Sequence, residues 1–126
     1  MFRVQEVPPA IVRLEFAGGM SAADEAAYLE TLDRLSMRDV PFVVVALMDG
    51  RNPLSSEGKK RQALWFKRSR ERLRACCRGL VRVPSGDARE GLGEAALAKA
   101  LPFPLAHAAS EAEAMRIAHS LLAGGQ

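Results

Sequence analysis

The sequence predicts an α/β domain in which helices pack on a mostly parallel sheet and an antiparallel strand lies at its amino-terminal edge. Three observations support this fold class. Phe42–Met48 is continuously apolar and β-branched, as in a central strand covered on both faces. Flanking segments show helical spacing of apolar residues, and strands alternate with helices in the order β-β-α-β-α-β-α-β-α. The chain has 126 residues, the length of one domain, which we assign to residues 1–126.

The amino-terminal part predicts two strands and a helix. Phe2–Val7 and Ile11–Phe16 have the alternation of half-buried strands, and the prolines between them suit a turn. A helix opens at Ser21 and runs to about Met37, because Asp24 stands three residues after Ser21 in an arrangement close to a capping box. We therefore expect the two strands to pair antiparallel at one edge of the sheet.

The carboxy-terminal part predicts three helices that alternate with two strands. We expect a long helix from Ser55 or Ser56 to about Cys77, followed by a strand at Leu80–Val83. A short helix at Glu94–Leu101 and a strand at Phe103–His107 come next. The last helix opens at the capping box of Ser110 and Glu113. Gly79 is expected to end the long helix as its C′ residue. Trp65 lies on the apolar side of that helix, which we expect to face the core.

The composition is that of an ordinary globular protein, with 48% apolar and 26% charged residues. No apolar run approaches the roughly 20 residues that a membrane-spanning helix needs, and the first residues do not resemble a signal peptide. We therefore expect a cytoplasmic protein. Cys76 and Cys77 are neighbours, and both histidines are far from them in sequence. This spacing predicts two buried thiols at a helix end, with no disulfide and no metal site.

Basic residues gather in one segment. From Arg51 to Arg82 there are eleven Lys and Arg residues against two Glu, so this segment carries +9 and the rest of the chain −6, for a net charge of +3. The long helix carries what we call the basic face: Lys59, Lys60, Lys67, Arg70 and Arg74. Leu64 lies on the same outer side. Such a face suits an anionic membrane surface or a protein partner, but it is also common as a solvated helix face. Nucleic acid is not an expected partner, because the helix has no interleaved set of stacking aromatic residues.

Polar residues follow the predicted strands at their carboxyl ends, where α/β folds usually bind ligands. This rim consists of Asp49, Arg51, Asn52, Ser85 and Asp87, with Ser55 nearby. Asp49 and Asp87 suit a pair of carboxylates, although Asp and Asn are also common turn residues. The chain contains no G-x-G-x-x-G, Walker A, H-E-x-x-H or G-x-S-x-G motif. We therefore expect a binding protein without catalytic residues, cofactor or metal, and no enzymatic activity.

Three segments resemble landmarks of one family, the STAS domains of anti-sigma-factor antagonists. Residues 18–24 (Gly-Gly-Met-Ser-Ala-Ala-Asp) resemble the G-x-x-T-x-x-D start of the first helix, Phe42–Asp49 resembles the apolar third strand that ends in Asp, and Ser110–Ala114 resembles the closing S-x-x-E-A helix. Residues 63–81 are similar to short uncharacterised bacterial members of the wider STAS-like and SEC14-related superfamily. The resemblance implies a STAS-like fold over nearly the whole chain.

The resemblance also implies a modification site. In these antagonists a partner kinase phosphorylates a serine of an Asp-Ser-Ser/Thr-Gly motif at the start of the helix after the third strand. The segment here is Leu54-Ser55-Ser56-Glu57-Gly58, in which both serines are present, the Asp is absent and Glu57 precedes the glycine. A phosphate on Ser55 or Ser56 would lie at a helix N-terminus, which favours anions, one turn from Lys59 and Lys60. The alternative is that Ser55 is only a helix cap.

These observations predict a non-enzymatic regulatory module of STAS type that binds a protein partner in bacterial signalling, with a homodimer left open. The alternative is a binder of a small anionic or lipid-like ligand, by analogy with SEC14-related proteins, or of an anionic membrane surface. The two functions need different features. A ligand binder needs an apolar cavity of several hundred Å³ beneath a movable element, whereas an interaction module needs only an exposed patch.

Overall fold

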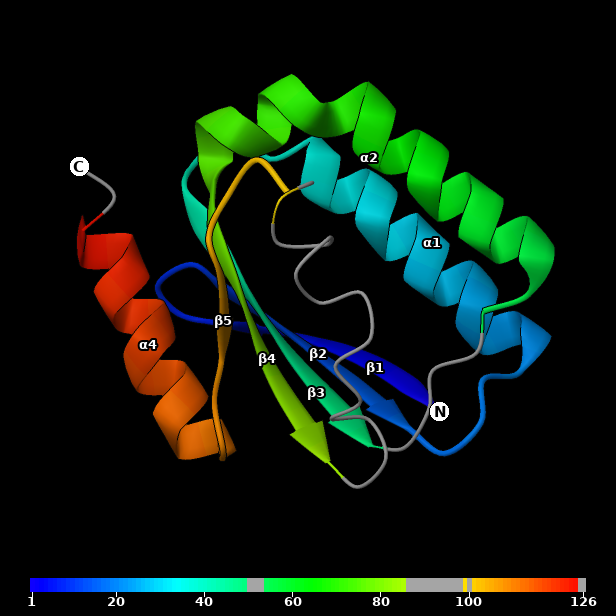
Figure 1. Cartoon of the computed structure of the whole chain (residues 1–126), viewed down its shortest axis with the longest axis horizontal. Helices are drawn as coiled ribbons and strands as arrows, with labels where there is room; N and C mark the ends of the chain where they lie inside the picture. The colour runs from blue at the N-terminus through cyan, green and yellow to red at the C-terminus, as the bar shows by residue number, and fades with distance from the viewer. Residues whose placement is uncertain (50–53, 86–98, 100, 125–126) are drawn as a thin grey trace.

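The computed structural model describes residues 1–49, 54–85, 99 and 101–124 (Figure 1). Its elements follow the predicted order: β1 (Phe2–Val7), β2 (Ile11–Ala17), α1 (Ala22–Ser36), β3 (Phe42–Asp49), α2 (Ser56–Cys76), β4 (Cys77–Ser85), β5 (Leu105–His107) and α4 (Glu111–Gly124). The short helix predicted at Glu94–Leu101 falls almost entirely outside the described residues. None of the described helices is long and apolar enough to cross a membrane.

The five strands form one sheet in the order β1-β2-β3-β4-β5. β1 and β2 pair antiparallel, with Phe2 opposite Phe16, and the other neighbours are parallel. The structure thus confirms the predicted α/β fold class, including the antiparallel edge strand and the central place of β3. β3 has this place because its apolar residues can be buried on both faces, which an edge strand does not require.

Helices cover both faces of the sheet, α1 and α2 on one and α4 on the other (Figure 1). Alternate residues of β3 point to these two layers, as the period of a strand requires. Phe42, Val44 and Ala46 belong to the cluster beneath α1 and α2, while Val43, Val45 and Leu47 pack with the cluster beneath α4. On the α4 side, Ala114 and Ala118 are fully buried, because their small side chains let the helix approach the sheet closely.

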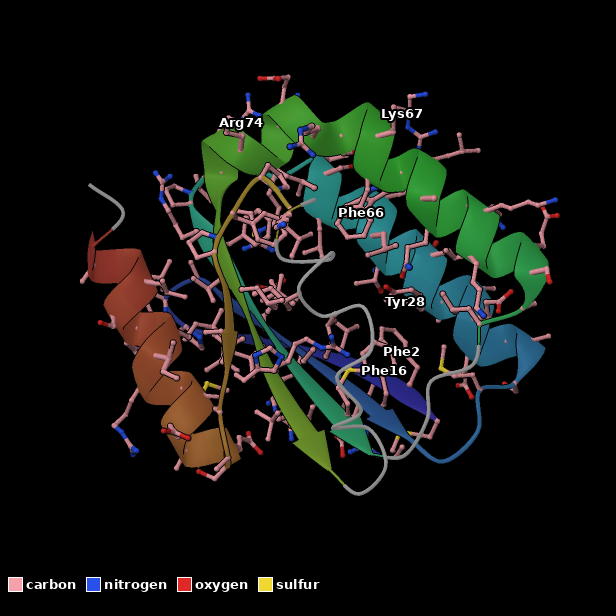
Figure 2. The ribbon with its side chains drawn as sticks, in the orientation of Figure 1. Phe2, Phe16, Tyr28, Phe66, Lys67 and Arg74 are labelled. Atoms are coloured by element: carbon pink, nitrogen blue, oxygen red, sulfur yellow. The ribbon has the colours of Figure 1, made fainter. Side chains whose placement is uncertain are left out.

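The first helix begins where its sequence indicates. Ser21 is the N-cap of α1, its side chain accepts a hydrogen bond from the Asp24 backbone, and the Asp24 carboxylate accepts one in return, which completes a capping box. Below this helix, the rings of Phe2, Phe16 and Tyr28 pack at centroid distances of 5.2 to 5.7 Å (Figure 2). This aromatic cluster anchors α1 to the edge of the sheet through β1 and β2.

The junction between α2 and β4 differs from its prediction. Cys77 already has extended backbone angles, so the helix ends at Cys76 and β4 begins without a loop. Gly79 is therefore a strand residue and not the C′ residue of α2. Its φ of +158° is strained for other residues, and a Cβ there would lie 2.7 Å from Cδ1 of Leu121. The glycine is thus needed for the close approach of α4 to β4, which helix-capping rules do not consider.

The remaining strands also differ in length from the prediction. β4 begins three residues earlier than expected, at Cys77, because it pairs along the whole of β3. β5 is restricted to Leu105–His107, after a segment with two prolines. The last helix starts as predicted, with Ser110 accepting from the Glu113 backbone at 3.2 Å. The Glu113 carboxylate accepts from the backbone of Ala109 at 2.7 Å, one residue before the position of an ordinary capping box.

Candidate functional site

The amino end of α2 lies at the carboxyl end of the parallel strands, where the sequence predicts the rim (Figure 1). The structure brings two of the five rim residues together, because Asp49 at the end of β3 pairs in register with Ser85 at the end of β4. Arg51, Asn52 and Asp87 lie outside the described residues. Of the predicted rim, the structure therefore shows only the backbone of Asp49 and Ser85, which lie side by side at the ends of β3 and β4.

Ser55 is the N-cap of α2, and a carboxylate from another helix holds it. Its hydroxyl oxygen accepts from the backbone of Gly58 at 3.0 Å and its hydroxyl donates to Oε2 of Glu25 at 2.7 Å. The backbone N–H of Ser55 donates to Oε1 of the same carboxylate at 2.8 Å. Glu25 belongs to the first turn of α1, so these contacts join the amino ends of the two helices.

The surroundings of Glu25 favour its charged form. Hydrogen bonds from the backbone and then the side chain of Ser55, together with the charge of Arg61, hold the pKa of the Glu25 carboxyl below its usual value. Gly58 makes room for this carboxylate, since a Cβ at position 58 would lie 2.6 Å from Cδ of Glu25. Glu25 is not among the predicted site residues, because it stands 30 residues before Ser55 and only the packing of α1 against α2 brings the two together.

Ser56 has a different environment from its neighbour. It is the first residue of α2 and is exposed, and no described residue hydrogen-bonds its side chain. Lys59 and Lys60 follow three and four residues later, which places them one helical turn away on the same side. The two serines therefore differ in chemistry. Ser55 is engaged as both donor and acceptor, while the hydroxyl of Ser56 is open to solvent next to two lysines.

The five residues of the basic face are all exposed. Figure 2 shows Lys67 on the outer side of α2 and Phe66 on the side that faces the sheet. The helix carries eight Lys and Arg residues against two Glu, a net charge of +6. Among the described residues, Lys60 and Lys67 have no ion pair, and Leu64 between them is 60% exposed. The face thus combines unpaired positive charge with one exposed apolar side chain.

No protein-family model matches this chain, and neither does any curated protein sequence. Two solved structures do resemble it. An uncharacterised protein of the DUF3478 family from Shewanella loihica, with a SpoIIAA-like fold, superimposes with a TM-score of 0.66 over 94% of this chain and 92% of its own, at 11% sequence identity. The fold is STAS-like. An anti-sigma factor antagonist from Mycobacterium paratuberculosis gives a TM-score of 0.55 over 94% and 93% of the two chains, at 16% identity.

Within this STAS-like fold, the segment Leu54-Ser55-Ser56-Glu57-Gly58 spans the start of α2, directly after the central strand in chain order. Glu25 supplies a carboxylate to the N-terminus of this helix from α1. Among the described residues, no group of three or more His, Cys, Asp or Glu side chains is arranged to hold a metal ion. The start of α2 therefore presents the hydroxyls of Ser55 and Ser56, the carboxylates of Glu25 and Glu57, and the two lysines.

Proposed function

We propose that this chain is a non-enzymatic, cytoplasmic regulatory module that binds a protein partner through the rim and the basic face, and that phosphorylation of Ser56 changes this binding. The STAS-like fold supports the proposal, since one of the solved structures that share it is an anti-sigma factor antagonist. The observation that carries it is the exposed hydroxyl of Ser56 at the first position of α2, beside the basic face.

Electrostatics favours Ser56 over Ser55 as the modified residue. A phosphate on Ser55 would remove the hydrogen bond from its hydroxyl to Oε2 of Glu25, which are 2.7 Å apart. It would also bring the phosphate into contact with the Glu25 carboxylate, so that two anionic groups repel each other. A phosphate on Ser56 meets the free N–H groups and positive dipole of the helix N-terminus, with Lys59 and Lys60 one turn away. It adds a charge of about −1.5 to −2 at the end of the basic face, which lowers the attraction for an acidic partner.

The test compares protein isolated from its native host with three variants. Mass spectrometry should find phosphate on Ser56 and not on Ser55. Ser56→Asp should reduce the capture of a defined set of partners that wild type and Ser56→Ala retain equally. Ser120→Asp adds the same charge at an exposed serine on α4 and should leave capture unchanged. Absence of phosphate at Ser56, together with equal capture by the Asp and Ala variants, would refute the switch.

A second candidate function is the binding of an anionic membrane surface, which the isolated exposure of Leu64 within the basic face favours. Lysine and arginine side chains near a membrane surface each contribute about 1 kcal/mol of attraction, and an apolar side chain can enter the headgroup region. Vesicle binding that requires Leu64 as well as the lysines would support this function over a protein partner. The other alternative, a small anionic or lipid-like ligand, would need a cavity, such as the groove where α2 passes into β4.

A further inference from the structure

A groove opens at the opposite end of the molecule from Ser56, where α2 passes into β4. Its walls come from the last turn of α2, the segment before β5 and the last turns of α4. Its volume is about 320 Å³, at the lower end of the range for natural ligand sites. The apolar part of the lining includes Phe103 and Leu121. The fold builds this groove through Gly79, which lets Leu121 lie against β4.

Two arginines line the groove, Arg74 at the end of α2 and Arg78 in β4, and none of the described residues that line it is acidic. The Nε atom of Arg78 is buried and has no hydrogen-bond partner among the described residues. The guanidinium of Arg74 contacts Glu71 at 3.1 Å on the exposed side of the helix, a surface ion pair that a ligand can displace at little cost. Nη1 of Arg78 donates to the carbonyl of Ala75 at 3.5 Å, and the buried Nε is closed to solvent. The positive charges of both guanidinium groups and their other Nη–H donors are therefore what the groove offers a bound anion.

The thiol of Cys77 adds no charge to the groove. Cys77 is 4% exposed and lines the groove beside the arginines. Burial raises the pKa of the Cys77 thiol to about 12, so the thiol stays neutral and contributes apolar surface. Among the described residues, the lining thus consists of mostly apolar residues, the hydroxyl of Ser120 and the two arginines, which give it a charge of +2.

We infer that this groove binds a small anionic amphiphile, with a carboxylate or phosphate on Arg74 and Arg78 and a short apolar body against Phe103 and Leu121. Charge complementarity decides the headgroup, because the planar guanidinium matches two oxygens of one anion. The volume decides the size, since a groove at the lower limit of ligand sites accommodates a short chain or a single ring. This site shares Arg74 with the basic face, but the inference does not depend on the partner binding proposed above.

The test uses isothermal titration calorimetry with octanoate and octyl phosphate, which distinguish the two headgroups. At least one should bind saturably to wild type, while acetate and 1-octanol, which lack the tail or the charge, should bind at least about tenfold more weakly. Arg78→Gln should weaken binding by about tenfold or more, the effect of losing one charge-assisted hydrogen bond. Arg74→Gln, at an exposed position, should have the same direction of effect without affecting folding.

Two controls make the result specific. Lys67→Gln removes the same charge from the outer side of α2 and should leave the affinity unchanged, as should Ser56→Asp. Amide NMR shifts on titration should concentrate at Cys77, Gly79 and Leu121. The inference fails if neither amphiphile binds saturably, or if Lys67→Gln weakens binding as much as Arg78→Gln. The latter result would indicate diffuse electrostatic attraction without a site.

Discussion

At the scale of single residues, Ser55 and Ser56 show how neighbours of the same type acquire different roles. Ser55 has the extended backbone of an N-cap, and the helix N–H groups and Glu25 use its hydroxyl completely. Ser56 is the first residue of the helix, and its side chain is exposed, with no hydrogen-bond partner among the described residues. One position along the chain therefore separates a structural cap from an accessible hydroxyl.

The contact between Glu25 and Ser55 predicts a dependence of stability on pH. The pKa of Glu25 is lower in the folded state than its usual value of 4.5, mainly through the hydrogen bonds from Ser55. The folded state therefore binds this proton less readily than the unfolded chain, and the stabilisation is present above pH 4.5 and is lost as the pH falls through the folded pKa. Glu25→Gln should lower the free energy of unfolding at about pH 7 by more than at about pH 3.

Urea unfolding of wild type and of Glu25→Gln at the two pH values measures how much the substitution lowers the free energy of unfolding at each. Glu30→Gln, at an exposed position on the same helix, is the control and should show a much smaller change with pH. If the two variants depend on pH in the same way, the contact with Ser55 is not the cause.

At the scale of elements, α2 has two sides with separate tasks. Trp65 is 4% exposed, its ring lies 4.9 Å from that of Phe66, and it belongs to the core cluster beneath α1 and α2. The basic face on the other side is exposed, and most of its charge has no close acidic neighbour among the described residues. The core side holds the helix on the sheet, and the outer side is left for a partner.

The separation of the two sides predicts opposite behaviour of two variants. Trp65→Ala should lower the free energy of unfolding by about 3–5 kcal/mol through lost burial and a cavity. Replacing Lys60, Lys67 and Arg74 with Gln should leave the melting temperature nearly unchanged, because exposed charges contribute about 0–1 kcal/mol each. The same triple variant should bind anionic vesicles more weakly and with a flatter salt dependence.

Thermal melting and vesicle titrations at two salt concentrations check both expectations. A control variant with Gln at Arg34, Lys99 and Arg116 loses the same charge at exposed positions outside α2 and should bind vesicles like wild type. Early unfolding of the triple variant on α2 would show that its charges are structural. Equal loss of binding in both triple variants would show that net charge matters and the basic face does not.

At the scale of the whole molecule, the sheet separates two unequal layers. The layer of α1 and α2 holds the larger side chains, including Phe42, Trp65 and Tyr28, while α4 packs on the other face through Ala114 and Ala118. An ion pair between Arg13 of β2 and Glu111, with N···O at 2.8 Å, fastens the start of α4 to the sheet. The distance between α4 and the sheet is therefore set by small residues, and added volume there should be costly.

This packing predicts that Ala118→Leu lowers the free energy of unfolding by about 1–3 kcal/mol, because the larger side chain must displace α4 from Val43, Val45 and Val81. Ala112→Leu, on the exposed side of the same helix, should change it by less than about 0.5 kcal/mol. Chemical unfolding of the two variants provides the comparison. Similar values for both would mean that α4 is not packed closely on the sheet.

The sequence by itself determined the features that depend on local chemistry and period. The continuously apolar run of β3, the capping box of Ser21 and Asp24, the apolar side of α2 and its basic face are readable because neighbours in the chain carry the information. Tertiary structure decided the features that depend on residues distant in sequence. Glu25 reaches Ser55 because α1 packs beside α2, and Gly79 is a strand residue because Leu121 occupies the space of its missing side chain. The groove at Arg78 is formed by three segments that meet only in the folded chain, so no pattern within any one of them could predict it.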